Sequence, residues 1–109
     1  MAIKDIRAKE LRNLIRTKSD DLEIIDVREP FEYKEVRIKK SKNIPMGELP
    51  ARINEIDWSK EVIFVCRSGN RSRFMAEIAA ASGKDVKNLQ FGILECGEEG
   101  GEFLEFSEN

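Results

Sequence analysis

Histidine is absent from this chain of 109 residues. Its absence excludes Ser-His-Asp triads, Cys-His dyads and metal sites built on imidazole. The two cysteines, Cys66 and Cys96, are too few for a disulfide framework. Long apolar runs are missing as well: nothing approaches the roughly 18 residues of a membrane span, and the first residues lack the apolar core of a signal peptide. We therefore expect a cytoplasmic protein with no metal and no cofactor.

Charge is abundant in the chain but nearly balanced. Charged residues make up 37% of it and apolar residues 40%, and the net charge is −2. This balance does not favour nucleic acid or an anionic membrane as a partner. The length predicts one domain over residues 1–109, acting as a monomer or weak dimer. Residues 98–109 are expected to form an acidic tail, from which Phe103, Leu104 and Phe106 fold back onto the body.

Short apolar runs alternate with amphipathic helical patterns along the chain. This alternation, with short connections, predicts an α/β fold on a mostly parallel sheet, in which ligands bind at the carboxyl ends of the strands. The apolar run at 62–65 is typical of a central strand covered on both faces. Strands are expected at 3–6, 22–27, 43–45, 62–65 and, as the last, 86–89; helices are expected at 8–16, 30–36, 48–56 and 71–82.

The most informative segment joins the strand at 62–65 to the helix at 71–82. It reads Cys66-Arg67-Ser68-Gly69-Asn70-Arg71-Ser72. A cysteine at a strand end, followed by a tight loop and a helix N-terminus, meets backbone N–H groups that favour negative charge. A thiolate in such a place has a lowered pKa, and an anionic sulfur compound can dock beside it. The alternative is a buried cysteine that acts as a small apolar residue; the attached loop favours the nucleophile.

Three segments together resemble the single-domain rhodanese family: Ile24-Ile25-Asp26-Val27-Arg28-Glu29-Pro30-Phe31-Glu32-Tyr33, then Asn43-Ile44-Pro45, then residues 66–72. The resemblance covers nearly the whole chain, from about residue 3 to residue 101. It implies a rhodanese-like sheet of about five mostly parallel strands with helices on both faces. It also implies a thiosulfate-type sulfurtransferase, in which Cys66 carries a persulfide between two half-reactions.

By the same resemblance, Cys66 is the catalytic residue that accepts sulfur. The residues implied to bind substrate around it are Arg67, Ser68, Gly69, Asn70, Arg71 and Ser72. Asp26 and Arg28 belong to a strand-end motif, and we expect them to support the scaffold through hydrogen bonds. The implied partners are small sulfur-containing anions and thiols, with a protein donor or acceptor of persulfide as a further candidate.

The chain departs from the family pattern in three places. The segment at 36–41 loses a histidine and two glycines and gains three basic residues. The glycine pair that usually follows the last strand reads Phe91-Gly92, and Cys96 stands where a tryptophan is expected. These changes affect a turn and the wall of the pocket, but none of them touches the Cys66 loop.

The spacing within the loop separates two chemistries. Four residues lie between Cys66 and Arg71, whereas the cysteine-dependent phosphatases that resemble rhodaneses have five, which makes room for a tetrahedral phosphate. The shorter loop fits a persulfide sulfur. A sulfurtransferase is therefore the leading hypothesis. A persulfide carrier is the alternative, and the sequence does not separate the two because both need the same loop. An intact Cys66 argues against a non-catalytic domain.

For several side chains the sequence allows two roles. Arg71 can handle anions, or it can pair with a carboxylate that fixes the loop. Cys96 can act as a resolving thiol, although an ordinary packed cysteine is favoured. The basic run at 37–42 is expected to be a solvated loop rather than an anion guide. Three aromatic residues are expected to serve packing alone: Phe31, Tyr33 and Trp58.

Overall fold

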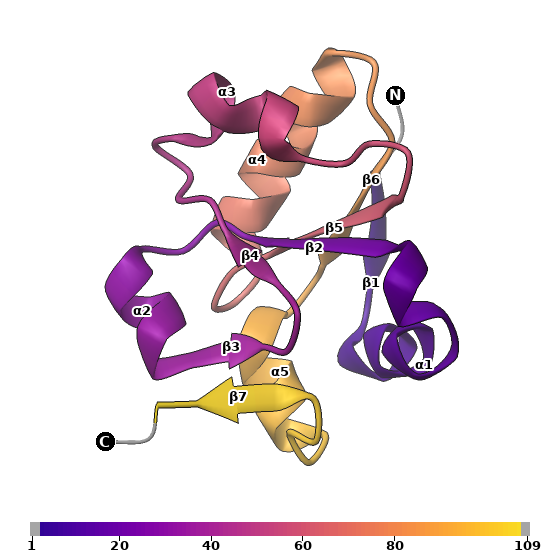
Figure 1. The fold of residues 1–109 in the computed structure, drawn as a ribbon, viewed down its shortest axis with the longest axis vertical. Helices are drawn as coiled ribbons and strands as arrows, with labels where there is room; N and C mark the ends of the chain where they lie inside the picture. The colour runs from indigo at the N-terminus through magenta and orange to yellow at the C-terminus, as the bar shows by residue number, and fades with distance from the viewer. Residues whose placement is uncertain (1–2, 108–109) are drawn as a thin grey trace.

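The computed structural model describes residues 3–107 (Figure 1). A five-stranded sheet has the order β1-β6-β5-β2-β4, and each of its pairings is parallel. Its strands are β1 (Ile3–Ile6), β2 (Leu22–Asp26), β4 (Lys42–Asn43), β5 (Glu61–Val65) and β6 (Val86–Leu89). The helices are α1 (Ala8–Lys18), α2 (Pro30–Glu35), α3 (Leu49–Arg52), α4 (Asn70–Ala81) and α5 (Gly92–Glu98). The prediction of an α/β fold on a five-stranded parallel sheet is confirmed.

Helices cover both faces of this sheet. In Figure 1, α3 and α4 lie on one face, and α1 and α5 lie on the other. The central strand β5 shows why: successive side chains of a strand point to opposite faces. Ile63 and Val65 pack in the cluster that holds α1 and α5, whereas Val62 and Phe64 pack in the cluster that holds α3 and α4. Within residues 3–107, no helix combines the length and the apolar character needed to cross a bilayer.

Two parts of the fold differ from the sequence-based expectation. The strand at 86–89 is not the last, because β7 (Leu104–Phe106) follows it and pairs antiparallel with β3 (Val36–Ile38) in a separate two-stranded sheet. The helix expected over 30–36 ends at Glu35, since Val36 belongs to β3. Helix α5 occupies residues for which no element was expected. Strands of three residues are too short for an alternating pattern to be recognised, and this pairing joins distant parts of the chain.

Other boundaries shift by a few residues. The helix expected over 48–56 is α3 followed by a 3-10 turn at Ile53–Glu55, and a second such turn, Ser19–Asp21, follows α1. The expected acidic tail is partly built into the fold, because Glu98 ends α5 and β7 lies beyond it. Phe103 and Leu104 are buried as expected, but Phe106 is 62% exposed. Residues 108–109 of that tail lie outside the described residues.

A buried ion pair closes the carboxyl end of β2. Asp26 accepts hydrogen bonds from the Arg28 backbone N–H at 3.0 Å and from Nη2 of the same arginine at 2.7 Å. The guanidinium also donates to the Val36 carbonyl at 2.6 Å, which ties β2 to β3. Asn43 of β4 donates to the carbonyls of both Asp26 and Arg28 at 3.0 Å. The strand-end carboxylate therefore organises the chain that follows β2, as expected for a scaffold residue.

Replacing Arg28 by alanine should remove about 3–5 kcal/mol from the free energy of unfolding, because it leaves the Asp26 carboxylate buried and without its cation. Denaturant unfolding of the variant and of the parent chain measures this loss. Arg52→Ala is the matched control, since Arg52 forms exposed ion pairs with Glu48 and Glu55. We expect little change there. Equal losses in the two variants would contradict the importance of the buried pair.

Candidate active site

Cys66 lies directly after β5 and four residues before the start of α4 at Asn70, at the carboxyl edge of the parallel sheet. The residue is 1% exposed. The Gly69 backbone N–H donates a hydrogen bond to Cys66 Sγ at 3.0 Å, and Ser72 Oγ lies 3.4 Å from the same sulfur. The loop therefore wraps the sulfur with donors, as its sequence predicts.

These donors lower the pKa of the Cys66 thiol. Burial is the largest single influence and raises the pKa, because it penalises the charged thiolate. Hydrogen bonds from the Ser72 hydroxyl and from the backbone N–H groups of Ser72, Gly69 and Ser68 act in the opposite direction and together outweigh burial. The result is a thiol that ionises more readily than an ordinary cysteine without any imidazole base.

Two glycines allow the loop to close this tightly. Gly69 has a φ of +104°, and a Cβ on it would lie 1.8 Å from the Gln90 carbonyl oxygen. Gly92 has a φ of +66°, and a Cβ there would lie 2.2 Å from the Arg67 carbonyl oxygen. Both positions therefore exclude a side chain for two reasons: the Cβ would clash with a carbonyl oxygen, and the positive φ disfavours any residue other than glycine. The single glycine kept in Phe91-Gly92 is the one that contacts the Cys66 loop.

The first turn of α5 binds the outward side of the loop. The Ile93 N–H donates to the Cys66 carbonyl at 3.0 Å, and the Leu94 N–H donates to the Arg67 carbonyl at 3.2 Å. With these carbonyls held away from the sulfur, the following N–H groups are free to face it. The segment after β6, where the sequence leaves the family pattern, thus forms one wall of the site.

Arg71 pairs with a carboxylate, which is one of the two roles left open above. Its Nη1 and Nη2 donate to the two oxygens of Glu32 at 2.8 and 3.0 Å. Glu32 also accepts the Glu29 backbone N–H at 3.0 Å and so closes the first turn of α2. The pair joins α2 to α4 across the mouth of the site. Sequence reasoning missed Glu32, although it lies six residues after Asp26 within the segment that carries the family resemblance.

The remaining residues of the Cys66 loop differ in their exposure to solvent. Gly69 and Ser72 are buried, whereas Arg67, Ser68 and Asn70 are exposed. A surface hollow of about 360 Å³ borders the loop; among the residues that line it are Ser68, Gly69, Asn70, Asn88 and Gln90. Asn88 and its neighbour Asp5 were not predicted. The only sequence signal was a polar residue inside the apolar strand at 86–89.

Cys96 lies in α5, fully buried among the residues that cover the α1 and α5 face of the sheet. Cys66 belongs to the cluster on the opposite face. Burial, with a smaller contribution from the nearby Glu95 charge, raises the pKa of Cys96 to about 12. These observations support a packed core cysteine, the favoured interpretation, and they make Cys96 a poor nucleophile at neutral pH.

The basic run is only partly the solvated loop that was expected, because Arg37 lies in β3 and Lys42 lies in β4, with the turn between them. Arg37 pairs with Glu105 at 3.3 Å and Lys42 pairs with Glu23 at 2.8 Å. Lys40 adopts a φ of +67°, so the turn keeps its left-handed residue even though the family's glycine is missing.

The expectation of packing is confirmed for Trp58, whereas Tyr33 is held by a hydrogen bond. Trp58 packs edge-on against Phe64, with 6.4 Å between ring centroids. Tyr33 donates its hydroxyl to the Ser41 carbonyl at 2.5 Å. The packing expected for Phe31 is wrong, since its side chain is 68% exposed beside Glu32.

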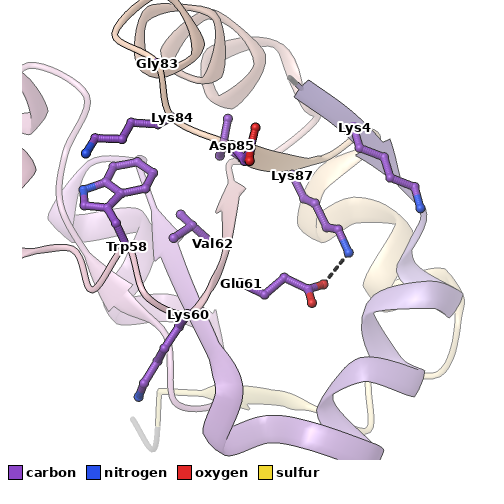
Figure 2. Close-up of a pocket in the computed structure, with 10 residues that line it drawn as sticks. Lys4, Trp58, Lys60, Glu61, Val62, Gly83, Lys84, Asp85 and Lys87 are labelled. Atoms are coloured by element: carbon purple, nitrogen blue, oxygen red, sulfur yellow. Dashed lines mark hydrogen bonds and ion pairs between the residues drawn. The ribbon is translucent and has the colours of Figure 1, made fainter. Parts of the chain in front are cut away.

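Another hollow of the described surface lies away from Cys66. It has a volume of about 470 Å³ and opens at the amino ends of β5 and β6, the opposite end of the sheet from Cys66. Figure 2 shows Trp58 and Lys84 on one side of it and the Lys87–Glu61 ion pair on the other. Lys87 is paired with Glu61, and Lys84 lies over the Trp58 ring. The site with the perturbed thiol is therefore the better candidate for chemistry.

Comparison with known proteins identifies the architecture. A model of the rhodanese-like domain matches residues 7–99. The chain belongs to this family. The Bacillus subtilis protein YtwF is 34% identical over 94 residues, which cover 86% of this chain and 90% of YtwF. A protein of Allochromatium vinosum named sulfurtransferase is 32% identical over 77 residues, which cover 70% of this chain and 72% of the relative.

Solved structures agree with this family assignment. A rhodanese-related protein from Thermoplasma volcanium superposes with a TM-score of 0.80 at 32% identity, over 89% of this chain and 93% of the other. The rhodanese architecture is thus shared along most of both chains. No group of three or more His, Cys, Asp or Glu side chains that could hold a metal ion occurs in the part of the chain that the structure describes.

The Arg71–Glu32 pair should make stability depend on pH in acid. The bidentate hydrogen bond from Arg71 is the main reason why the pKa of Glu32 falls from its ordinary 4.5 to about 2. A depressed carboxyl pKa contributes stability that is present above pH 4.5 and is lost as the pH falls through about 2. Glu32→Gln should therefore lose about 2 kcal/mol of unfolding free energy at pH 7.

Denaturant unfolding of both proteins between pH 7 and pH 2 measures this difference. The difference in unfolding free energy between the parent chain and Glu32→Gln should disappear as the pH falls from 4.5 to about 2. Glu48→Gln, which alters an exposed pair with Arg52, should differ little from the parent in unfolding free energy at every pH. A difference for Glu32→Gln that stayed constant down to pH 2 would contradict the ionised pair.

Proposed function

We propose that this rhodanese-family chain is a sulfurtransferase that moves a sulfane sulfur from thiosulfate or a persulfide donor to a thiol or cyanide acceptor. The observation that carries the proposal is the Cys66 sulfur held at the loop centre by the Gly69 N–H at 3.0 Å. This donor and the neighbouring amides favour an anionic sulfur. They are held in place before reaction, so little reorganisation is needed when charge develops.

Two displacements account for turnover. In the first, the Cys66 thiolate attacks the outer sulfur of thiosulfate; a new S–S bond forms, the old one breaks, and sulfite leaves with the electron pair. Cys66 then carries a persulfide anion. In the second, an acceptor thiolate or cyanide attacks the outer sulfur and forms an acceptor persulfide or thiocyanate, while the Cys66 thiolate is restored. Each step follows the rules of thiol–disulfide exchange and needs neither oxidant nor metal.

The loop residues take distinct roles in this proposal. Gly69, Ser68 and Ser72 supply donors to the reacting sulfur atoms. Arg67 is exposed at the mouth of the loop, where its guanidinium favours anionic donors. Arg71 adds positive charge near Cys66 but acts chiefly as a positioning residue, because both of its terminal nitrogens bind Glu32.

The same geometry disfavours a phosphatase. In such chemistry an arginine fork binds phosphate oxygens beside the cysteine. Here the Arg71 fork is already engaged by Glu32. We further propose a cytoplasmic setting, because the reaction needs Cys66 as a free thiol and reducing compartments keep thiols in that state.

Intact-mass spectrometry after incubation with thiosulfate tests the sulfurtransferase. The chain should gain the mass of one sulfur atom and lose it again on addition of cyanide. Cys66→Ser should gain nothing and should form no thiocyanate, while its unfolding transition stays close to that of the parent. Cys96→Ser is the matched control and should still take up sulfur. Thiocyanate formation retained by Cys66→Ser would refute the proposal.

A persulfide carrier is the second candidate, and an apolar rim beside the loop favours it. Phe91 and Leu94 are 45% and 46% exposed. They line a hollow of about 380 Å³ together with Ser68 of the loop. Exposed apolar side chains gathered at a reactive group favour a protein partner over a small anion. On this hypothesis the chain receives persulfide from one protein and delivers it to another, with slow turnover of free thiosulfate.

The two candidates differ in how they respond to Phe91→Ser combined with Leu94→Ser. A carrier should lose about tenfold in the rate of sulfur transfer from a protein persulfide, the cost of one good apolar contact. A persulfidated small protein with a single exposed cysteine serves as donor. Transfer from thiosulfate should fall much less. Phe106→Ser, which removes a more exposed phenylalanine on β7, away from the Cys66 loop, is the control. Equal loss with both donors would contradict a docking role for the rim.

A further inference from the structure

A chain of hydrogen bonds leads from the Cys66 sulfur to the protein surface. Ser72 Oγ lies 3.4 Å from Cys66 Sγ and donates to Asn88 Oδ1 at 2.6 Å. Asn88 Nδ2 donates to Asp5 Oδ1 at 3.1 Å, and the other oxygen of Asp5 accepts from Arg73 Nη1 at 2.9 Å. Ser72 and Asn88 are 0% and 2% exposed, so both depend on these partners, although Asn88 also borders the hollow beside the loop.

The fold explains why these side chains meet. Asp5 of β1 and Asn88 of β6 are partners in the parallel register, so their side chains leave the sheet on the same face. The α4 helix packs on β6, and Ser72 lies in its first turn. None of the expectations drawn from the sequence connected Asp5 or Asn88 to the reactive cysteine.

The charge on Asp5 fixes the direction of every proton in the chain. A carboxylate only accepts, so the amide of Asn88 must turn its Nδ2 toward Asp5 and its Oδ1 toward Ser72. An amide oxygen also only accepts, and Asn88 Oδ1 at 2.6 Å is much closer to Ser72 Oγ than the Gly69 carbonyl oxygen at 3.3 Å, so the single hydroxyl proton of Ser72 points at Asn88. While the proton stays on this shorter bond, the Ser72 oxygen presents lone pairs to Cys66, an arrangement that suits a neutral thiol. The longer bond from the Ser72 hydroxyl to Cys66 Sγ, which lowers the pKa of the thiol, forms when the proton turns away from Asn88.

A thiolate at Cys66 needs the opposite arrangement. The Ser72 hydroxyl must rotate and donate to the sulfur, which leaves Asn88 Oδ1 buried without a donor. Leaving a buried acceptor unpaired costs free energy. The Asn88 amide cannot flip to relieve the loss, since its oxygen would then face the Asp5 carboxylate. The surface carboxylate therefore opposes ionisation of a thiol with which it makes no direct contact.

We propose that Asp5 and Asn88 are positioning residues that hold the Ser72 hydroxyl proton away from Cys66 and so limit the thiolate available for sulfur transfer. The inference builds on the proposed role of Cys66 as nucleophile and names the residues that tune it. It also gives a physical reason for a polar residue within β6.

Other charged groups surround the same thiol and must be separated from this effect. They are Arg67 in the loop, Arg71 and Arg73 on α4, Asp26 and Arg28 at the end of β2, and Glu32 on α2. Arg71 and Glu32 compensate each other, and so do Asp26 and Arg28. Arg73 is shared between Asp5 and the exposed Glu77. Glu77 thus provides a carboxylate that touches the same cation but not Asn88.

The test is the rate at which iodoacetamide alkylates Cys66 as a function of pH, located by peptide mass spectrometry. Asp5→Asn allows the Asn88 amide to flip, because an amide at position 5 can donate as well as accept. The hydroxyl proton of Ser72 then becomes available to the thiolate. We expect the midpoint of the alkylation profile to move to lower pH. Below the midpoint the rate should rise about threefold, since tenfold more thiolate is partly offset by its weaker nucleophilicity.

Three companion variants decide the cause. Glu77→Gln should leave the profile unchanged. In a Ser72→Ala background, Asp5→Asn should have no effect, because the hydroxyl that transmits it is missing. In a Ser72→Thr background, which retains the hydroxyl, the effect should return. A shift of equal size in the Ser72→Ala background, or no shift in the parent chain, would overturn the proposal. Because alkylation is measured instead of sulfur transfer, the outcome does not depend on the proposed function.

Discussion

The contact between the Cys66 loop and the first turn of α5 governs the geometry of the site. Ile93 and Leu94 donate to the carbonyls of Cys66 and Arg67 at 3.0 and 3.2 Å. This docking needs Gly92, whose missing side chain lets the two backbones approach. With those carbonyls bound outside, the loop turns its N–H groups toward the sulfur. The lowered pKa of a buried thiol in a chain without histidine follows from this arrangement.

The loop is held from three further directions. On the α2 side, the bidentate Arg71–Glu32 pair ties the start of α4 to the start of α2. Beneath the sheet edge, the buried Asp26–Arg28 pair sets the path of the chain that leads into α2. Toward the surface at β1, Ser72 and Asn88 complete a buried polar network. For the sulfur transfer proposed above, a sulfur supported in this way would need little reorganisation during reaction, and preorganisation of this kind is a main source of catalytic benefit.

Much of the fold could be predicted from residue patterns. The buried strand at 62–65, the strand ending at Asp26 and the amphipathic helix after the Cys66 loop each carry a local signal, and together they indicate a parallel α/β sheet. The β3–β7 pair carries none, since each strand has three residues and its partner is far away in the chain. Helix α5 was not predicted from the sequence, because Phe91 and Leu94 look like core residues but are exposed beside the Cys66 loop.

The sequence alone determined which residue is the candidate nucleophile and which backbone surrounds it, because a strand, a cysteine, a glycine-containing turn and a helix start are contiguous. Tertiary structure alone decided which distant side chains connect to the Cys66 loop through hydrogen bonds. Glu32, Asn88 and Asp5 come from three different elements, and they meet only because parallel pairing and helix packing bring those elements together. Tertiary structure also settled the environment of Cys96, since burial depends on the whole fold and not on neighbours in sequence. The residues of the Cys66 loop are adjacent in the sequence and can be recognised there. The pKa of a thiol, by contrast, depends on burial and on distances to groups that only the folded chain brings near it.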